Sequence, residues 1–134
     1  MSECRVNELV VDTSVWVEFF RGMPLPVLET ALEQGMVVLA PIVVAELLSA
    51  PISPRERTKL ADMLADLPLH DTPFDHWRAV GELRARLARR GLTVSTPDAH
   101  VAQCAIDRAA SVWSRDQVFE RIAATGEIRI LSEK

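Results

Sequence analysis

The sequence predicts a three-layer α/β/α domain with a mainly parallel central sheet of about five strands. Short apolar runs alternate with helical patterns, and the clearest run is Leu-Val-Val at 9–11, directly before Asp12. A continuous apolar run is typical of a parallel strand that helices cover on both faces, because a half-exposed strand would alternate. A helical segment between such runs is the usual parallel crossover.

Apolar periodicity and turn residues give the order of the elements. Strands are expected at residues 9–11, 36–40, 67–70, 111–114 and 128–131. Helices are expected at residues 14–20, 27–33, 41–48, 54–65, 73–90, 97–109 and 118–125. The run 67–70 contains a proline, so we expect it at an edge of the sheet.

Residues with side-chain oxygens precede several helices and are expected to cap them. Ser53 and Glu56 match a capping box, in which each side chain accepts a hydrogen bond from the other residue's backbone amide. Thr72 and Thr96 precede the next two helices, each followed by a proline that suits the first helical position. These caps define where the helices begin.

Composition fits a single domain, residues 1–134, without a second one. Hydrophobic residues make up 49% of the chain and charged residues 25%, so a sizeable core can form. No run approaches the roughly 20 apolar residues of a membrane helix, and no signal-peptide pattern opens the chain. We therefore expect a cytoplasmic protein with no membrane segment.

Four acids are expected at one edge of the sheet. Asp12 follows the first strand, and Asp116 follows the run 111–114. Glu46 lies in the helix after the second strand, and Asp98 lies in the first turn of a later helix. The carboxyl ends of parallel strands and the starts of the following helices converge, so these carboxylates should meet.

Each acid also has a purely structural interpretation. Asp98 and Asp116 lie at helix starts, where Asp commonly interacts with free amides and the positive end of the helix dipole. Asp12 could be a turn residue and Glu46 a solvated helix residue. Glu46, however, is the single polar residue in the apolar run 42–48, where a carboxylate needs a cation or a metal.

Four short segments around these acids resemble one family of enzymes. The segments are Val-Asp-Thr-Ser at 11–14, Val-Ala-Glu-Leu at 44–47, Pro-Asp-Ala-His at 97–100 and Ser-Arg-Asp-Gln-Val-Phe at 114–119. In this order they resemble the PIN-domain ribonucleases, and among these the VapC toxins of bacterial toxin-antitoxin pairs. The resemblance covers nearly the whole chain. It implies a magnesium-dependent endoribonuclease, with Mn²⁺ as a substitute ion.

The resemblance also implies roles for individual residues. Asp12, Glu46, Asp98 and Asp116 become the catalytic metal ligands, which suits two-metal phosphodiester hydrolysis. Ser14 and Ser114 would position metal-bound water or substrate, and Ser114 stands where relatives often carry Thr. The family further implies an RNA substrate, a cognate antitoxin that blocks the pocket, and a homodimer.

The net charge of −4 ordinarily argues against a nucleic-acid partner. Divalent cations at the acids would reverse the local sign, so RNA is not excluded. A basic cluster late in the predicted helix 73–90 either contacts the RNA backbone or forms a solvated face. Its members are Arg84, Arg86, Arg89 and Arg90.

Other functions were weighed against cleavage. A catalytically silent PIN-like module that binds RNA or protein is the main alternative, which a missing acid would favour. A haloacid-dehalogenase-type phosphatase is excluded because Ser14 stands where that family has a second Asp. Dinucleotide binding is excluded because no GxGxxG follows the first strand.

The remaining reactive residues are given no chemistry from their spacing. Cys4 and Cys104 form no CxxC pair and have no His or Cys at a familiar zinc spacing. The three histidines are expected to be structural or surface residues. The three tryptophans are expected to pack against other side chains rather than to stack on bases, and base stacking stays open for Trp16, which lies close to Asp12.

Overall fold

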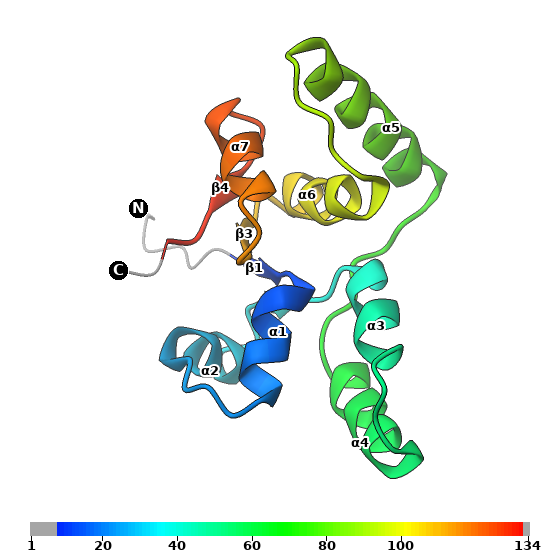
Figure 1. The fold of residues 1–134 in the computed structure, drawn as a ribbon, viewed down its shortest axis with the longest axis vertical. Coiled ribbons are helices and arrows are strands. Elements are labelled where there is room, and N and C mark those ends of the chain that lie inside the picture. The colour runs from blue at the N-terminus through cyan, green and yellow to red at the C-terminus, as the bar shows by residue number, and fades with distance from the viewer. Residues whose placement is uncertain (1–7, 133–134) are drawn as a thin grey trace.

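A computed structural model describes residues 8–132 as a parallel sheet with helices around it (Figure 1). The strands are β1 (Leu9–Val11), β2 (Val37–Val38), β3 (Ser111–Trp113) and β4 (Arg129–Ile130). The helices are α1 (Thr13–Phe20), α2 (Pro26–Glu33), α3 (Pro41–Leu48), α4 (Pro54–Ala65), α5 (Phe74–Arg89), α6 (Thr96–Arg108) and α7 (Val118–Ala124). The predicted fold class is confirmed. None of these helices is long and apolar enough to cross a membrane.

The strand order is β2-β1-β3-β4, and all neighbouring strands are parallel. From β1 the chain crosses to β2 on one side, and it later returns to place β3 on the other side. In open α/β sheets such a change of direction leaves a crevice beyond the strand ends, where ligands bind. The loops after β1 and β3 therefore flank the expected binding site.

Apolar side chains explain how the layers hold together. Val10 pairs with Val38 on one side and Val112 on the other, and all three are fully buried. Helix α6 packs against β1 and β3, with α5 outside it, while α2 packs on β2 and α7 on β4 (Figure 1). Small buried residues on α6, such as Ala102, allow close approach to the sheet. Trp16 and Trp113 belong to this core, as predicted.

The described residues form a sheet of four strands, so the expectation of a fifth strand at residues 67–70 is wrong. This run makes one isolated parallel bridge between Leu39 and Leu69. The Leu39 amide donates to the Pro68 carbonyl at 2.8 Å, and the His70 amide donates to the Leu39 carbonyl at 2.9 Å. Pairing stops there because Pro41 already begins α3.

The predicted caps are partly confirmed. In the capping box of α4, the Ser53 amide donates to Glu56 Oε1 at 2.9 Å and the Glu56 amide donates to Ser53 Oγ at 3.1 Å. The prediction for Thr96 is wrong, because Ser95 precedes α6 and its Oγ accepts from the Asp98 amide at 3.3 Å. Thr72 is not a cap either, since Pro73 occupies that position. Cys4, to which the sequence assigned no chemistry, lies outside the described residues 8–132.

Candidate active site

Asp12 occupies the crevice between β1 and β3, and only 8% of its surface is exposed. Its Oδ2 accepts hydrogen bonds from Ser114 Oγ at 2.7 Å and from Ser14 Oγ at 3.2 Å. The Asp12 amide donates to the Trp113 carbonyl at 2.9 Å, which ties the end of β1 to the end of β3. The carboxylate is therefore fixed from both strands.

Ser14 and Ser114 join the two loops of the crevice. Their Oγ atoms lie 3.3 Å apart. Ser14 Oγ accepts from the Arg115 amide at 2.9 Å, and Ser114 Oγ accepts from the Asp116 amide at 3.0 Å. Asp116 Oδ1 in turn accepts from the Val118 amide at 3.0 Å, at the start of α7. One short network thus sets the positions of Asp12 and Asp116.

Glu46 reaches the crevice from α3. Its side chain is exposed, and its Oε1 accepts a hydrogen bond from Thr13 Oγ1 at 2.5 Å. Thr13 directly follows Asp12, so this bond holds Glu46 beside the β1 loop. Thr13 is a site residue that the sequence did not predict. Its place next to Asp12 was the only available signal.

Asp98 is half-buried in the first turn of α6. Burial raises the pKa of its carboxyl, and a hydrogen bond with Ser95 partly opposes this shift. The negative charges of Asp116, Asp12 and Glu46 raise the pKa of Asp98 further. The other three acids therefore lie where their negative charges act on the Asp98 carboxyl. We call these four residues the carboxylate cluster.

The sequence profile of the PIN domain family matches residues 9–125, which is most of the chain and includes all four acids. The chain belongs to the PIN domain family. PIN domains are generally nucleases.

Three solved structures share the fold of this PIN domain. A chain of DNA-bound VapBC from Salmonella typhimurium is 23% identical with a TM-score of 0.77, covering 94% of this chain and 98% of that one. A chain of VapBC2 from Rickettsia felis bound to a promoter DNA fragment is 21% identical with a TM-score of 0.74, covering 92% of this chain and 96% of that one. A chain of VapBC-5 from Mycobacterium tuberculosis, a member of the VapBC family of toxin-antitoxin systems, is 23% identical with a TM-score of 0.69. The match covers 96% of this chain and 100% of that one. Comparison with curated proteins gives no match.

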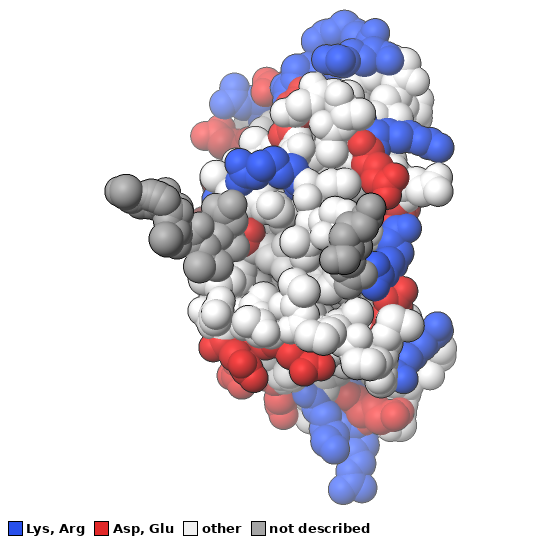
Figure 2. Space-filling view, turned by 90° about the vertical axis from the view of Figure 1, so that its left-hand side faces the viewer, with Lys and Arg blue, Asp and Glu red and all other residues white. Residues whose placement is uncertain are grey.

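The arginine cluster at the end of α5 in this PIN domain is partly engaged in contacts within the protein. Arg84 Nε donates to a backbone carbonyl of the following loop at 2.8 Å. Arg86 binds the Glu127 carboxylate at 2.9 and 3.1 Å. Arg89 and Arg90 are exposed, and Figure 2 shows basic side chains at the upper end of the molecule, where α5 finishes. RNA contact by the cluster stays a prediction, centred on these last two residues.

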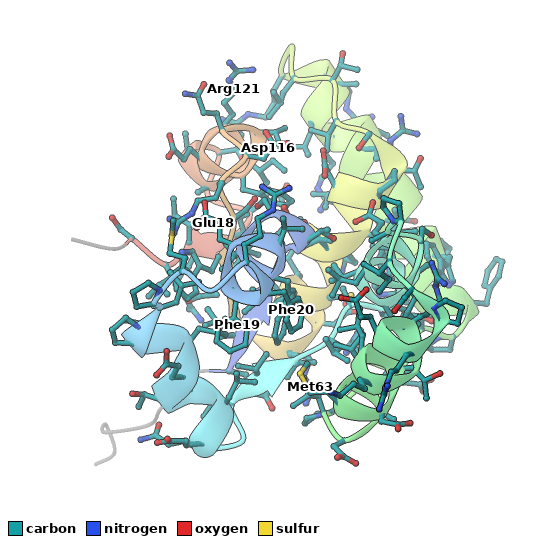
Figure 3. All side chains as sticks on the ribbon, turned by 60° about the horizontal axis from the view of Figure 1, so that its bottom comes forward. Glu18, Phe19, Phe20, Met63, Asp116 and Arg121 are labelled. Carbon is teal, nitrogen blue, oxygen red and sulfur yellow. The ribbon has the colours of Figure 1, made fainter. Side chains whose placement is uncertain are left out.

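An apolar groove of about 580 Å³ runs between α1, α3 and α4 of this PIN domain. Val17 and Phe20 line one side, and Leu60 and Met63 line the facing side (Figure 3). Leu47, the neighbour of Glu46 in sequence, also lines the groove. Phe20 is 43% exposed, which is unusual for so large an apolar side chain. The groove and the carboxylate cluster therefore both involve α3.

Proposed function

We propose that this PIN domain is a magnesium-dependent endoribonuclease and the toxin of a VapBC-type toxin-antitoxin pair. The observation that carries the proposal is the convergence of the carboxylate cluster from four separate parts of the chain. Burial raises the pKa of Asp98, and the charges of the other three acids raise it further, as expected when carboxylates repel one another. A bound divalent cation would relieve this repulsion.

The donors of the carboxylate cluster fit Mg²⁺. They are carboxylate oxygens with two serine hydroxyls beside them, and Mg²⁺ prefers oxygen ligands and keeps several of its waters. Mn²⁺ shares the preference for oxygen and would substitute. Asp12, Glu46, Asp98 and Asp116 would hold the ion.

The protein's own part in catalysis is to fix these carboxylates and to bind RNA. Divalent cations, when bound, activate a water molecule and neutralise charge on the phosphate and the leaving oxygen. Ser114 orients two acids at once, because its hydroxyl donates to Asp12 and accepts from the Asp116 amide. Exposed Arg89 and Arg90 would bind backbone phosphates of the RNA.

The toxin assignment includes a cognate antitoxin that blocks the site. The apolar groove supports this partner, because a segment seated there would cover Phe20 and approach Glu46. A homodimer and a cytoplasmic location belong to the same proposal. Light scattering on the purified chain tests the dimer directly.

The direct test of function is cleavage of a structured RNA by the purified protein. We expect cleavage with Mg²⁺ or Mn²⁺ and none with EDTA. Sequencing of the RNA ends after expression of wild type and Asp98→Asn would identify the cut sites. RNA that is bound but left intact with every divalent ion would instead identify a catalytically silent RNA-binding module.

Millimolar Mg²⁺ is expected to raise the melting temperature of the wild-type protein. An ion that binds only the folded form stabilises it by mass action, by about 2.7 kcal/mol at a hundred times its Kd. Differential scanning fluorimetry with and without EDTA measures the shift. An unchanged melting temperature over the whole metal titration would count against the site.

Asp98→Asn is the matched control for this experiment, and without metal we expect it to raise the melting temperature rather than lower it. The pKa of Asp98 is higher in the folded than in the unfolded chain, so stability falls as the pH rises through this raised pKa. The loss of folding stability is complete above the raised pKa of Asp98, including at neutral pH. The variant removes the charge and should melt higher than the wild type in EDTA. It should also gain less from Mg²⁺.

Ser114→Ala is expected to lower the cleavage rate by about tenfold and to keep the fold. The change removes a donor to Asp12 Oδ2, and hydrogen bonds to charged groups contribute about 1.5–3 kcal/mol. Ser114→Thr retains the hydroxyl and should stay near the wild-type rate. Ser49→Ala is the control, because Ser49 Oγ bonds only to a carbonyl of its own helix, at 2.6 Å. Equal rates for Ser114→Ala and Ser49→Ala would remove Ser114 from the site.

A further inference from the structure

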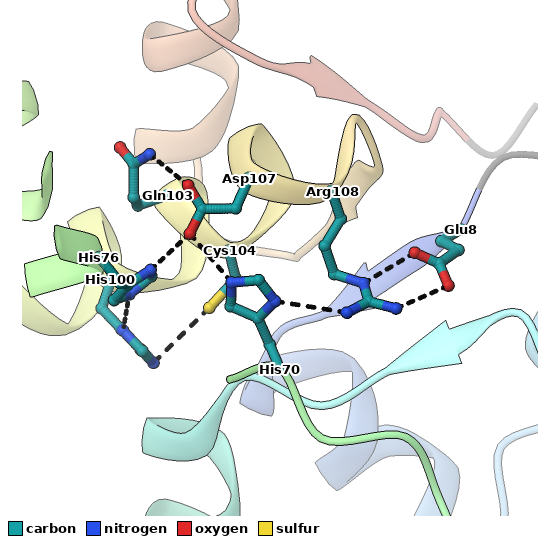
Figure 4. A network of polar contacts seen from close by, with 8 residues as sticks. All are labelled: Glu8, His70, His76, His100, Gln103, Cys104, Asp107 and Arg108. Carbon is teal, nitrogen blue, oxygen red and sulfur yellow. Dashed lines mark hydrogen bonds and ion pairs between the residues drawn. The ribbon is translucent and has the colours of Figure 1, made fainter. Parts of the chain in front are cut away.

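The three histidines of this chain meet in one buried cluster together with Cys104 and Asp107 (Figure 4). We call these five residues the histidine cluster. His70, His76 and His100 are 8%, 4% and 0% exposed. His100 follows Asp98 by two residues on α6, so its side chain turns away from the carboxylate cluster. Of the two expectations for the histidines, structural or surface, burial excludes the surface one, and the cluster is a polar centre separate from the carboxylate cluster.

Asp107 is the centre of the contacts in the histidine cluster (Figure 4). Its Oδ2 lies 2.9 Å from His70 Nε2 and 2.6 Å from His76 Nδ1. The other nitrogen of His76, Nε2, lies 2.8 Å from His100 Nδ1. His100 Nε2 lies 3.7 Å from Cys104 Sγ. The five side chains thus form one connected unit.

Burial of so many polar groups is costly unless they serve as partners for one another or for a ligand. His100 and Cys104 are fully buried, and His70 and His76 are nearly so. Apolar side chains would fill the same space without the cost of removing imidazole and thiol groups from water. The close approach of ligand atoms from His70, His76 and Cys104 gives this arrangement a use beyond packing.

We propose that His70, His76 and Cys104, with Asp107 as the fourth ligand, bind one Zn²⁺ ion at a site separate from the carboxylate cluster. One donor atom from each of the first three residues lies within 4.8 Å of the other two. Around tetrahedral zinc, bond lengths of about 2.0–2.3 Å separate the donors by about 3.3–3.8 Å. His70, His76 and Cys104 would therefore move slightly inward, while Asp107 Oδ2, now 2.6 and 2.9 Å from the two imidazole nitrogens, would move slightly away from them.

The chemistry of the donors distinguishes this site from the carboxylate cluster. Imidazole nitrogen and thiolate sulfur are ligands for zinc and similar transition metals, whereas Mg²⁺ takes oxygen. Asp107 would supply the fourth ligand after a small shift, because its Oδ2 is the carboxylate oxygen next to both imidazoles. The thiol of Cys104 would lose its proton on binding, as every zinc-bound cysteine does.

The surroundings supply the outer contacts that zinc ligands normally have. With the ion on His76 Nδ1, the Nε2–H of that ring would donate to His100 Nδ1, 2.8 Å away. Gln103 Nε2 donates to the second oxygen of Asp107 at 2.8 Å and fixes its orientation. The Asp107 side chain is 27% exposed while that of His76 is 2% exposed, so an ion would enter past the carboxylate.

Cobalt(II) is the probe for this site, because tetrahedral Co²⁺ shows visible d–d bands and a bound thiolate adds a charge-transfer band. We expect the metal-stripped full chain to show both bands with one equivalent of Co²⁺ and to lose both when Zn²⁺ is added. Cys104→Ser should abolish the charge-transfer band. His76→Gln should weaken Co²⁺ binding by at least about tenfold.

Two matched variants distinguish this site from others in the chain. Cys4→Ser removes the other thiol and should leave both bands unchanged. Asp98→Asn alters the carboxylate cluster and should also leave them unchanged, so failure of the nuclease proposal would not affect this one. Circular dichroism checks that each variant is folded. Absence of the bands in folded wild type, or an unchanged charge-transfer band in Cys104→Ser, would overturn the proposal.

Discussion

Asp98→Asn is expected to reduce metal-dependent RNA cleavage by at least about a hundredfold, because metal ions supply several kcal/mol of transition-state stabilisation. The change is nearly isosteric and removes one negative charge from the carboxylate cluster. The Ser95 hydroxyl still accepts from the backbone amide of residue 98, so α6 should begin as before. The measurement is kcat/KM on a structured RNA at saturating Mg²⁺.

Asp62→Asn is the control for this prediction. Asp62 is an exposed acid on α4, outside the carboxylate cluster, so its variant should cleave at the wild-type rate. Both variants are purified by the same steps, which controls for contaminating ribonucleases. Cleavage by Asp98→Asn at the rate of Asp62→Asn would remove Asp98 from the catalytic machinery.

Trp113→Ala is expected to lower the free energy of unfolding by about 3–5 kcal/mol, the usual cost of truncating a buried aromatic side chain. Trp113 is 1% exposed and pairs with Val11 in the sheet. Small domains have total stabilities of about 5–15 kcal/mol, so the loss is a large fraction. Urea denaturation followed by circular dichroism measures it.

Trp77→Ala makes the same chemical change in a different environment. Trp77 is 41% exposed and stacks on His100 with ring centroids 4.6 Å apart. Its truncation should cost less than half as much as that of Trp113, because part of its surface is already in water. Equal costs for the two variants would contradict the core described above.

The sequence predicted the parts of the site that depend on local patterns. Asp12 directly follows a buried strand, and Asp116 lies just beyond another, so parallel pairing alone places them at the same edge. The capping box of Ser53 and Glu56 was likewise predictable, because its residues are three apart. Glu46 was signalled by its lone position in an apolar helix.

Features that depend on packing between distant segments were not predictable from spacing. The histidine cluster draws one residue from the loop after α4, one from α5 and the others from α6, and their sequence separations match no zinc motif. The packing of α5 against α6 and the contact of the loop at His70 with Asp107 bring them together. The isolated bridge at Leu69 and the cap at Ser95 also follow from how the chain meets its neighbours.

The most direct test of the carboxylate cluster is Mn²⁺ binding measured by electron paramagnetic resonance. We expect wild type to bind Mn²⁺ and each single change, Asp12→Asn, Glu46→Gln, Asp98→Asn or Asp116→Asn, to weaken binding, while Asp62→Asn does not. Folded wild type that bound no Mn²⁺, or four variants that all bound it as tightly as wild type, would contradict the carboxylate cluster.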